Sequence, residues 1–417
     1  MITTIDKCRV SNRNIKEIWD LGNFYLSHFY DDQKKDYPSS KLRIGIGEGS
    51  NLIQLLESVE RDAMYRNYWY LSGTNKTMTK QLKDIVEIVP NWVNIKDDDI
   101  VLDIGCNDGT LLDLYSKDIK VKKYGIDPAT NLSKLAKSKI QNYLCDYFTA
   151  NNFLNFSNNA KAKVITSIAM FYDQEDPNKF TKDIYDCLAD DGIWILQLSY
   201  TPLMIMQNAF DNIVHEHLEY YTLNSLEYIL HNNGFKIVDA ELNNTNGGSI
   251  RVVACKNKNQ MDNVSLFNNE IGLVRRQSII EFENNNFEDM EKSLLNLKKR
   301  VENLKNETLD LLHKLKKNGK KVIGYGASTK GNTLLQYYGI NSSLIEFIAE
   351  KQKQKFGKYT PGSWIQIISE EKMRSLSPDY LFILPWHFTT EFLKRERDLL
   401  KNGTKFIVPL PNLKILE

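Results

Sequence analysis

Short apolar runs alternate with longer polar stretches from residue 97 onward, and the polar stretches have compositions that are compatible with helices. This alternation is typical of βαβ units, in which helices cover both faces of a parallel sheet. The first group of predicted strands comprises Ile100–Ile104, Tyr124–Ile126, Tyr143–Cys145, Val164–Ile168 and Ile193–Leu198. These runs predict one α/β domain with five parallel strands.

Two further β-rich runs, Phe235–Leu242 and Ser249–Cys255, are joined by six residues that include Gly247-Gly248. A short connection rich in Asn and Gly between two such runs favours an antiparallel hairpin. Five parallel strands followed by a hairpin are more typical of a methyltransferase sheet than of a symmetric dinucleotide-binding fold.

After the hairpin, apolar residues recur at intervals of three and four positions from Phe287 to Leu315, which predicts one long amphipathic helix. Asn318-Gly319 is a typical helix end. Four more strand-like runs then predict a second α/β segment: Lys321–Tyr325, Leu344–Ala349, Tyr380–Leu384 and Lys405–Val408. The first 95 residues contain aromatic clusters but no regular period, so they predict no defined elements.

A length of 417 residues, with 54 Lys and Arg against 53 Asp and Glu, suits a folded protein of two or three domains. A net charge of +1 argues against a general affinity for nucleic acid. No apolar run reaches the roughly 18–20 residues of a membrane span, and the first residues lack the apolar core of a signal peptide, so we expect a cytoplasmic protein. Five widely separated cysteines predict neither disulfides nor a metal site.

The segment from Asp103 to Gly109 follows the first predicted strand directly and leads into a helix-compatible run. Its glycines, Gly105 and Gly109, are spaced G-x-x-x-G, and Asn107 stands where a phosphate-binding G-x-G-x-x-G turn has its second glycine. The acid at the strand end and the lack of that glycine favour a ligand with an ammonium group, such as the amino-acid end of S-adenosylmethionine.

Acidic residues also end the next two predicted strands. Asp127 lies 24 positions after Asp103, close to the spacing at which an acid binds a ribose hydroxyl in such folds. Asp146 and Tyr147 end the third strand, where a carboxylate can accept a hydrogen bond from an adenine amino group. Open α/β sheets bind ligands at the carboxyl ends of their strands, so these residues predict the cofactor site.

A histidine pair, His215 and His217, follows the fifth predicted strand and brackets Glu216. Imidazole is a frequent general base because its ordinary pKa of about 6.5 is close to neutral pH. No other metal ligand is obvious near the pair, so proton transfer is the better use. His217 is the predicted base, and Glu216 is expected to orient it.

The segment Gly324–Thr333 follows a predicted strand and enters a helix-compatible run that contains Lys330. It resembles an anion-binding turn, and on its own it would permit an NAD domain. Gly331 falls two positions too late to be the third glycine of G-x-G-x-x-G. This favours a turn that holds the diphosphate or sugar of a substrate.

Together, these motifs resemble those of the S-adenosylmethionine-dependent nucleotide-sugar C-methyltransferases over almost the whole chain. The resemblance implies a zinc-binding lobe (residues 1–75), a class I methyltransferase domain (76–258), a helical linker (259–318) and a Rossmann-like domain for the nucleotide sugar (319–417). We expect a nucleotide-sugar substrate and no nucleic-acid or membrane partner, and both a monomer and a homodimer remain open. The matching stretches are Leu21-Gly22, Tyr68–Ser72, Asp103–Gly109, His215–Leu218, Gly247–Ser249, Gly324–Leu335, Tyr359–Gly362 and Leu384–Trp386.

Two features depart from the family's pattern. Where the family has two Cys-x-x-Cys pairs, this chain has Cys8 with Ser11 and Gly47 with Ser50. A zinc site needs about four good ligands, so we expect a lobe without metal. Val214 stands where relatives often have an aromatic hydroxyl, which changes the surroundings of the base.

The resemblance implies methyl transfer to a carbon beside the ketone of a nucleotide-linked sugar. His217 would remove the proton, and Tyr68, Tyr70 or Tyr221 would donate a hydrogen bond to the enolate oxygen. The residues expected to hold the substrate are Gly326, Lys330, Asn332 and Trp386. Three alternatives remain open: an O-methyltransferase, an NAD-dependent oxidoreductase and a binding subunit without catalysis.

Overall fold

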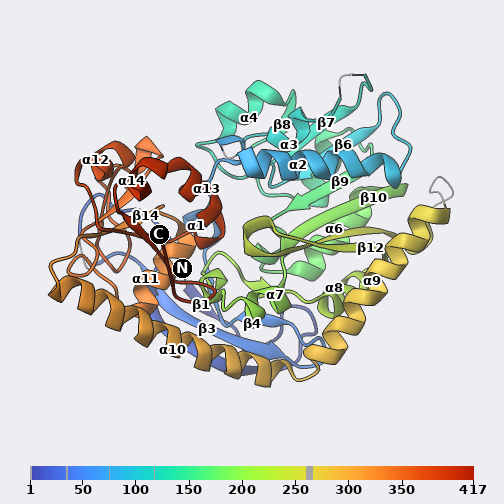
Figure 1. The fold of residues 1–417 in the computed structure, drawn as a ribbon. Helices are drawn as coiled ribbons and strands as arrows, with labels where there is room; N and C mark the ends of the chain where they lie inside the picture. Colours follow the sequence, from blue (N-terminus) through green and yellow to red (C-terminus); the bar gives the residue numbers. More distant parts are fainter. Residues whose placement is uncertain (1, 34–35, 75, 117, 260–265) are drawn as a thin grey trace.

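A computed structural model of the chain describes residues 2–33, 36–74, 76–116, 118–259 and 266–417 (Figure 1). Residue 75, where the predicted lobe ends, and residues 260–265 of the predicted linker lie outside the described residues. The described strands form a short two-stranded pair and three larger sheets, which lie in the amino-terminal, central and carboxy-terminal regions of the chain.

The central region is a seven-stranded sheet in the order β12-β13-β10-β9-β6-β7-β8. Strands β6 to β10 are parallel, and the β12–β13 hairpin adds two antiparallel strands at one edge. The predicted parallel strands and hairpin are confirmed, and together they form one α/β sheet with the expected antiparallel last hairpin. The bounds are β6 Ile100–Ile104, β7 Lys122–Ile126, β8 Asn142–Leu144, β9 Ala162–Ile168, β10 Leu188–Ser199, β12 Phe235–Asn243 and β13 Ser249–Lys256.

Helices cover both faces of this sheet because alternate residues of its buried strands point to opposite sides. Leu102 and Trp194 belong to a core with α5, α6 and α8, whereas Val101 and Ile193 belong to a second core with α2, α3 and α4. The helices are α2 Lys76–Ile88, α3 Thr110–Asp113, α4 Ser133–Lys139, α5 Ala150–Phe156, α6 Pro177–Cys187 and α8 Leu223–Asn232. The carboxyl ends of the parallel strands stay open between these layers.

The amino-terminal region contains an antiparallel sheet ordered β11-β4-β3-β2 and a short β1–β5 pair. The bounds are β1 Ile2–Thr4, β2 Ile15–Tyr25, β3 Ser39–Gly47, β4 Ile53–Leu55, β5 Glu57–Val59 and β11 Glu219–Tyr220. The sequence predicted no element here because the β2–β3 register shifts twice, between Glu17 and Trp19 and between Asp20 and Asn23. Such irregularities interrupt the alternation of apolar and polar side chains. Through β11, the segment that follows His217 joins this sheet.

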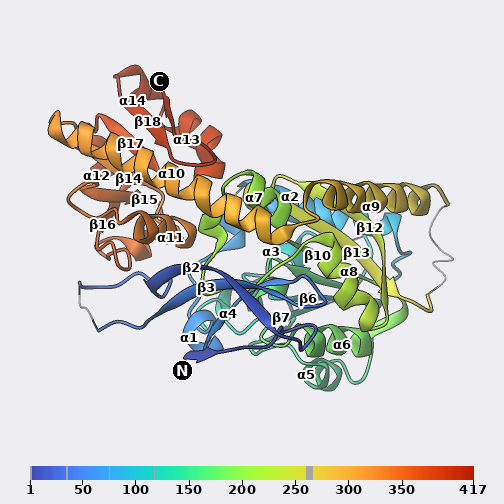
Figure 2. The same ribbon diagram turned by 90° about the horizontal axis from the view of Figure 1, so that it is seen from below.

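A helix of 28 residues, α10 (Met290–Lys317), contacts β2, α7 (Thr201–Met206) and β14 (Val322–Tyr325), and so touches all three regions (Figure 2). It begins where the Asp289 side chain accepts a hydrogen bond from the Lys292 N–H at 2.8 Å, and it ends before the left-handed Gly319. The predicted long helix is therefore confirmed. Its buried face shares one core with Trp19 of the lobe and Tyr325 of the carboxy-terminal sheet.

Helix α9 (Leu266–Asn286) precedes α10 within the stretch for which the resemblance implies a helical linker, but the apolar pattern did not predict it as a separate helix. Its apolar residues do not form a single stripe, since Leu273 and Val274 are exposed while Ile279 is buried. The helix packs closely on β12 at Gly272, where an added Cβ would lie 2.4 Å from the carbonyl oxygen of Val238.

The carboxy-terminal region is a six-stranded sheet ordered β16-β15-β14-β17-β18-β19, parallel except for β19. Its further bounds are β15 Phe347–Glu350, β16 Gln366–Ser369, β17 Tyr380–Ile383, β18 Lys405–Val408 and β19 Lys414–Leu416. The second predicted α/β segment is confirmed. Strand β14 leads through the turn at Gly326 into α11 (Thr329–Tyr338).

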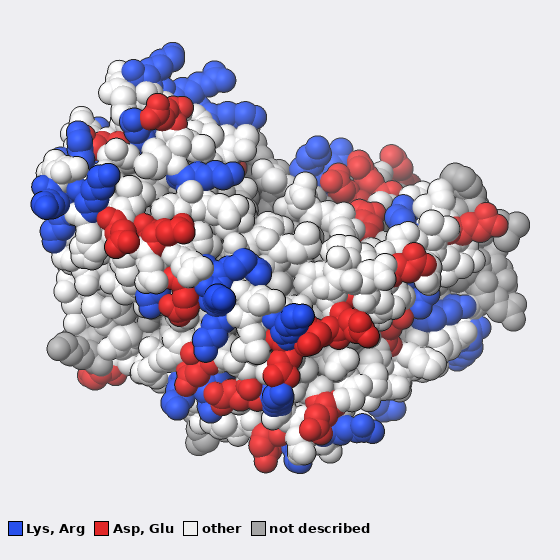
Figure 3. Space-filling model, turned by 60° about the horizontal axis from the view of Figure 1, so that its bottom comes forward, with Lys and Arg blue, Asp and Glu red and all other residues white. Residues whose placement is uncertain are grey.

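Basic and acidic side chains both occur on the face of the molecule that Figure 3 draws, with uncharged areas between them. This mixture is expected from a net charge of +1. Among the described residues, the exposed large apolar side chains, such as Met206 and Val274, belong to several different elements. None of the helices in the described part of the chain is both long and apolar enough to cross a membrane.

Candidate active site

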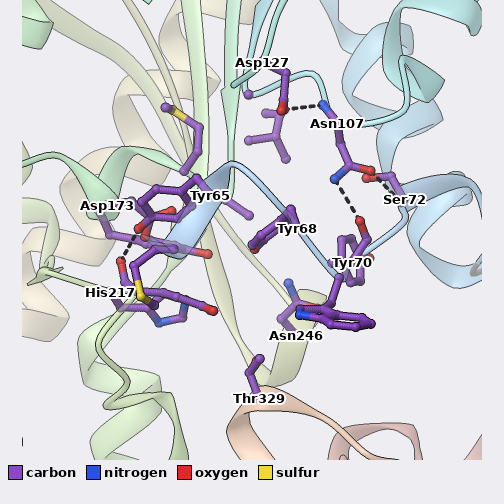
Figure 4. A pocket seen from close by; sticks show the side chains of 18 of the residues that line it. Tyr65, Tyr68, Tyr70, Ser72, Asn107, Asp127, Asp173, His217, Asn246 and Thr329 are labelled. Atoms are coloured by element: carbon purple, nitrogen blue, oxygen red, sulfur yellow. Dashed lines mark hydrogen bonds between the residues drawn. The ribbon is translucent and has the colours of Figure 1, made fainter. Parts of the chain in front are cut away.

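A cavity of about 340 Å³ lies where the three regions meet. Its walls come from the carboxyl ends of β6, β7 and β9, from residues 27–29 and 61–72, from residues 216–217, and from three turns of the carboxy-terminal region, at residues 327–330, 352–355 and 385–388. In Figure 4, Asp127 and Asn107 lie at one side of this space, whereas Asn246 and Thr329 lie at the other. The cavity therefore extends from the strand ends that carry the predicted cofactor residues to the second α/β segment.

The glycine loop after β6 is held in shape by its own backbone and by Asn107. The Asn107 N–H donates to the Asp127 carboxylate at 2.8 Å, its Nδ2 donates to the Tyr70 carbonyl at 3.0 Å, and its Oδ1 accepts from the Ser72 N–H at 3.0 Å (Figure 4). Asn107 has a φ of 53°, a left-handed conformation that Asn tolerates better than most residues. The loop is thereby tied to the segment that carries Tyr68 and Tyr70.

Gly105 and Gly109 have different roles in this loop. Gly105 lines the cavity with a φ of 70°, and an added Cβ would lie 3.0 Å from the Met170 side chain. Gly109 does not line the cavity; it starts α3, where an added Cβ would lie 2.8 Å from the Ile140 side chain. The backbone of Gly105 therefore faces the cavity. The missing side chain of Gly109 instead allows the start of α3 to pack closely on Ile140.

Two strand-end acids reach the cavity. Asp103 accepts a hydrogen bond from the Thr166 hydroxyl at 2.6 Å, and burial raises its pKa to about 7. Asp127 accepts from the N–H groups of Asn107 and Ala129, both at 2.8 Å, and burial raises its pKa to about 6. These two carboxylates and the open backbone at Gly105 fit the ammonium and ribose hydroxyls of S-adenosylmethionine.

Of the two residues predicted at the end of the third strand, Tyr147 reaches the cavity and Asp146 does not. Tyr147 lines the cavity, and the guanidinium groups of Arg61 and Arg66 lie 4.5 and 4.8 Å from its ring centre. The Tyr147 hydroxyl donates to Asp62 at 2.9 Å. Asp146 does not line the cavity; its carboxylate accepts from the Tyr147 N–H and lies 3.7 Å from Arg66. The structure thus brings the ring of Tyr147, and not the carboxylate of Asp146, to the predicted adenine end.

His217 lines the cavity with one ring nitrogen fixed by the backbone. Its Nδ1 lies 3.0 Å from the Asn212 carbonyl oxygen, which can only accept a hydrogen bond. Nδ1 therefore carries the proton, and Nε2 keeps a free lone pair. Burial, together with the charge of Lys330, lowers the pKa of His217 to about 3, so the imidazole is neutral at neutral pH.

Glu216 lines the cavity but does not orient the imidazole as expected. The orienting group is the Asn212 carbonyl, and no hydrogen bond joins the Glu216 carboxylate to His217 among the described residues. Burial raises the pKa of Glu216 to about 7. His215 lies outside the cavity, with its Nε2 3.3 Å from the Lys41 carbonyl oxygen of the lobe.

The predicted tyrosines do not all reach this space. Tyr68 and Tyr70 line the cavity, and Figure 4 shows Tyr68 between Asp127 and His217. Tyr221 is fully buried elsewhere, stacked on Phe171 with ring centres 5.2 Å apart. Strand residues alternate in direction, and the bridge from Tyr221 to Tyr200 turns its ring into the core.

Tyr65 and Asp173 line the cavity but were not predicted. The Tyr65 hydroxyl donates to the Glu216 carbonyl at 2.8 Å (Figure 4). Burial raises the pKa of Asp173 well above its usual range, and the charges of Glu216 and Glu219 add to the shift. Asp173 lies five residues after the end of β9. The rule that acids at strand ends bind ligands would have identified it if residues farther beyond the strand end had been considered.

Lys330 is the one predicted substrate residue on the cavity wall. Its Nζ donates to the Asn246 carbonyl at 3.1 Å. Burial lowers the pKa of Lys330, although the negative charge of Asp211 acts in the opposite direction. Gly326 instead packs on Pro385, where an added Cβ would lie 2.6 Å away. The other two, Asn332 and Trp386, lie behind the wall: Asn332 is 1% exposed, and the Trp386 Nε1 donates to Asp211 at 3.0 Å.

A second lysine on the wall, Lys355, was not predicted. It is 7% exposed, and its Nζ donates to the Ala327 carbonyl at 2.7 Å. Its sequence surroundings are ordinary, with lysines at positions 351, 353 and 358, so no local signal distinguishes it.

The four positions of the degenerate zinc pattern come together in the lobe. The Cys8 Sγ lies 3.2 Å from the Ser50 Oγ, and the Ser11 N–H donates to that sulfur at 3.5 Å. A Cβ added to Gly47 would lie 2.4 Å from the same sulfur, so the Cys8 thiol fills the space left by glycine. The described residues include no group of three or more His, Cys, Asp or Glu that could hold a metal ion. These residues do not fit a tetrahedral zinc site, and a metal-free lobe stays a prediction.

Comparisons with known proteins relate the chain to methyltransferases. A family model described as a methyltransferase domain matches residues 74–240, and one described as a C-methyltransferase C-terminal domain matches residues 244–411. The chain is 28% identical over 366 residues to the C-methyltransferase NovU of Streptomyces niveus, which covers 88% of this chain and 85% of that protein.

Two solved methyltransferase structures are similar to less than half of this chain. The magnesium protoporphyrin IX methyltransferase of Synechocystis PCC 6803 with bound SAH is similar over 44% of this chain and 88% of that chain, with 14% identity and a TM-score of 0.36. An S-adenosylmethionine-dependent methyltransferase of Clostridium acetobutylicum is similar over 43% and 92%, with 16% identity and a TM-score of 0.33.

Proposed function

The chain belongs to the S-adenosylmethionine-dependent C-methyltransferases, and from this premise we propose that it methylates a carbon beside the ketone of a nucleotide-linked sugar. In this proposal residues 76–258 bind the methyl donor, and residues 319–417 hold the nucleotide part of the acceptor. The observation that carries the proposal is one cavity in which the acids of the cofactor end, a neutral histidine and two lysines face the same space.

The cofactor supplies an electrophilic methyl group on a sulfonium centre. Asp103 and Gly105 would hold its amino-acid end, Asp127 its ribose hydroxyls, and the ring of Tyr147 its adenine. Ionised carboxylates accept hydrogen bonds from ammonium and hydroxyl groups more strongly than neutral acceptors do. These residues orient the donor and leave the far side of the cavity to the acceptor.

His217 acts as the base. A carbon is nucleophilic only after the proton beside the ketone has been removed, and the Nε2 lone pair of His217 is the available acceptor for that proton. The Asn212 carbonyl fixes the tautomer, so the ring need not turn before each reaction. The lowered pKa of the imidazole keeps it unprotonated at neutral pH.

The negative charge that forms on the ketone oxygen needs a fixed partner. Tyr68, Tyr70 and Lys330 line the cavity, and the charge of Lys330 reaches His217, since it lowers the pKa of that imidazole. Preorganised donors in a site shielded from water stabilise such an oxyanion most effectively. The same arrangement would serve less well in O-methylation, where no oxyanion beside a carbonyl develops.

Hydrogen exchange tests the proposal directly. The protein is incubated in D₂O with S-adenosylhomocysteine and a panel of nucleotide 4-keto-sugars, and deuterium at the carbons beside the ketone is measured by NMR and mass spectrometry. We expect exchange at one carbon, and methylation of that carbon when labelled S-adenosylmethionine is supplied. Methylation without any exchange, with the label on oxygen, would establish O-methylation instead.

A further inference from the structure

Two carboxyl groups face the same part of the cavity, and neither has a cation as its partner. Asp173 and Glu216 both line the cavity, and Glu216 is only 7% exposed. Among the described residues, neither carboxyl group takes part in an ion pair or a hydrogen bond. Arg9 lies 3.5 Å from Glu219 and neutralises that acid instead. Two buried acids without a cation do not both ionise, so this pair keeps a proton near neutral pH.

The proton of the pair belongs to Asp173. Burial and the charges of Glu216 and Glu219 raise the pKa of Asp173 well above its usual range, whereas burial raises the pKa of Glu216 to about 7. The Asp173 Oδ1 is sealed inside the protein without a hydrogen-bond partner, but the Oδ2 is not sealed in this way. A neutral carboxyl group is a hydrogen-bond donor through its O–H. The Oδ2 is therefore the atom through which Asp173 can donate to a ligand in the cavity.

Asp173 lies on a segment that packs against the base. The ring of the preceding residue, Tyr172, lies 4.3 Å from the ring of His217, measured between their centres. The Leu218 N–H donates to the Tyr172 carbonyl at 2.8 Å, so the two segments lie side by side. Figure 4 shows Asp173 and His217 at the same side of the cavity, across from Tyr70. A ketone whose neighbouring carbon meets the His217 imidazole therefore has its oxygen beside the segment of Asp173.

The segment of the base itself offers no hydroxyl donor at this place. Val214 stands where relatives often have an aromatic hydroxyl; it is 2% exposed and does not line the cavity. The hydroxyl groups of Tyr220 and Tyr221 are sealed in the core. Donors to the ketone oxygen therefore come from other elements of the chain, and Asp173 is the acid among them that adjoins the imidazole.

We propose that Asp173 is a further catalytic residue, a neutral carboxylic acid that donates a hydrogen bond to the ketone oxygen while His217 removes the neighbouring proton. The proposal rests on the proposed function, which supplies the ketone. The proton goes to the His217 Nε2, and the electron pair of the broken C–H bond moves to the carbonyl oxygen. The O–H of Asp173 stabilises the negative charge on that oxygen and keeps its own proton. An ionised carboxylate at this place would repel the same charge.

Exchange kinetics test this role. Deuterium uptake from D₂O by the nucleotide 4-keto-sugars is measured with the full chain saturated with S-adenosylhomocysteine. We expect Asp173→Ala to slow the exchange about 100- to 1,000-fold, the usual cost of losing one donor to an oxyanion. Asp173→Asn, whose amide keeps the shape and a donor, should stay within about tenfold of the wild type. Asp186→Asn is the matched control, since Asp186 is exposed and does not line the cavity, and it should change nothing.

The pH profile separates a neutral acid from a structural role. With both ligands saturating, the exchange rate of the wild type should decrease at high pH as Asp173 loses its proton. This decrease should be absent in Asp173→Asn. The titratable groups that face Asp173 are Glu216, Glu219, Tyr65, Tyr68 and Tyr172. All of them are present in both proteins, so the difference between the two profiles reports on Asp173.

Infrared spectra detect the proton without any acceptor. The complex with S-adenosylhomocysteine is compared between the wild type and Asp173→Asn near neutral pH. We expect the carbonyl stretch of a neutral carboxyl group in the wild type and its loss in the variant. Equal affinity for S-adenosylhomocysteine in calorimetry shows that the variants are folded.

Three results would each overturn the role of Asp173: exchange as fast in Asp173→Ala as in the wild type, exchange as slow in Asp173→Asn as in Asp173→Ala, or no infrared band that depends on Asp173. A wild type that exchanges a keto-sugar under any of these results keeps the proposed function. A protein that shows the band but neither exchanges nor methylates any keto-sugar loses the proposed function and keeps Asp173 as a neutral acid.

Discussion

The central and carboxy-terminal regions use the same local design with opposite charges. In each, a buried parallel strand runs into a glycine with positive φ, Gly105 or Gly326, and then into a helix. At the ends of β6 and β7 the cavity wall carries the carboxyl groups of Asp103 and Asp127, whereas the segments after β14 and β15 bring Lys330 and Lys355 to it. Gly105 leaves its backbone open to the cavity, but Gly326 is closed by Pro385.

The difference shows how one scaffold sorts two ligands. The acidic end suits a donor with hydroxyl and ammonium groups, and the basic end suits a diphosphate. Because the two charged ends face one cavity, each also discourages the other's ligand. In the proposed function the reaction takes place where the two ends meet, at His217.

The largest effect is expected at this meeting point. His217→Ala should lower kcat by about two to four orders of magnitude, the usual contribution of general acid–base catalysis, because no proton acceptor remains beside the ketone. Affinity for S-adenosylhomocysteine should stay nearly constant in calorimetry. Full deuterium exchange in this variant would assign the base to another cavity residue, with Glu216 next in line.

Removing one acid should affect the donor alone. Asp127→Ala should weaken S-adenosylhomocysteine binding by roughly 1–3 kcal/mol, the scale of lost hydrogen bonds to a charged group. Asp127→Asn, which retains one acceptor oxygen, should lose less. Calorimetry provides the measurement, and an unchanged affinity in Asp127→Ala would remove this residue from the donor site.

The corresponding change at the basic end of the cavity is a substitution of Lys355. Lys355→Met should weaken nucleoside diphosphate binding by about tenfold, or roughly 1.4 kcal/mol, because the amino end of α11 still holds part of the charge. Affinity for S-adenosylhomocysteine should not change. If both ligands were weakened equally, the two ends would not be independent sites, and the comparison between them would fail.

The acidic end also predicts a pH dependence of donor binding. Burial raises the pKa of Asp103 to about 7 and of Asp127 to about 6, and the ionised forms are the ones that accept hydrogen bonds from the donor. Affinity for S-adenosylhomocysteine should therefore be full near pH 8 and fall as the pH drops through 7 and 6, by at most tenfold per unit for each group. Asp127→Asn should remove the lower part of this dependence, and a flat profile in the wild type would contradict the raised pKa values.

The smallest effect is expected in the lobe. Protein prepared without added metal should contain no zinc, and EDTA should leave the Tm unchanged to within about 1 °C, since a bound metal that stabilised the lobe would raise Tm measurably. Elemental analysis decides the point. One zinc per chain would show that other ligands complete a site around Cys8.

Buried parallel strands could be predicted from sequence because their apolar runs need no partner to be recognised. The strands of the lobe could not, since their bulges break the alternation and their pairing with β11 spans more than 150 residues. The strand-end acids followed from topology alone, as Asp103 and Asp127 show. The directions of side chains could not be predicted from topology. For this reason the sequence did not reveal that the Tyr221 ring packs in the core, or that the Asn212 carbonyl, and not Glu216, orients the imidazole of His217.

Helix α10 has a consequence for how the two reactants meet. At 1.5 Å per residue, its 28 residues span about 42 Å, and its buried face is packed into a core that includes both the lobe and the carboxy-terminal sheet. A continuous helix that is fixed along its length resists the hinge motion by which many two-substrate enzymes close. The donor site and the acceptor site are then already aligned when the chain has folded, so little further conformational entropy is lost when the two substrates bind. The active site acts as a rigid template.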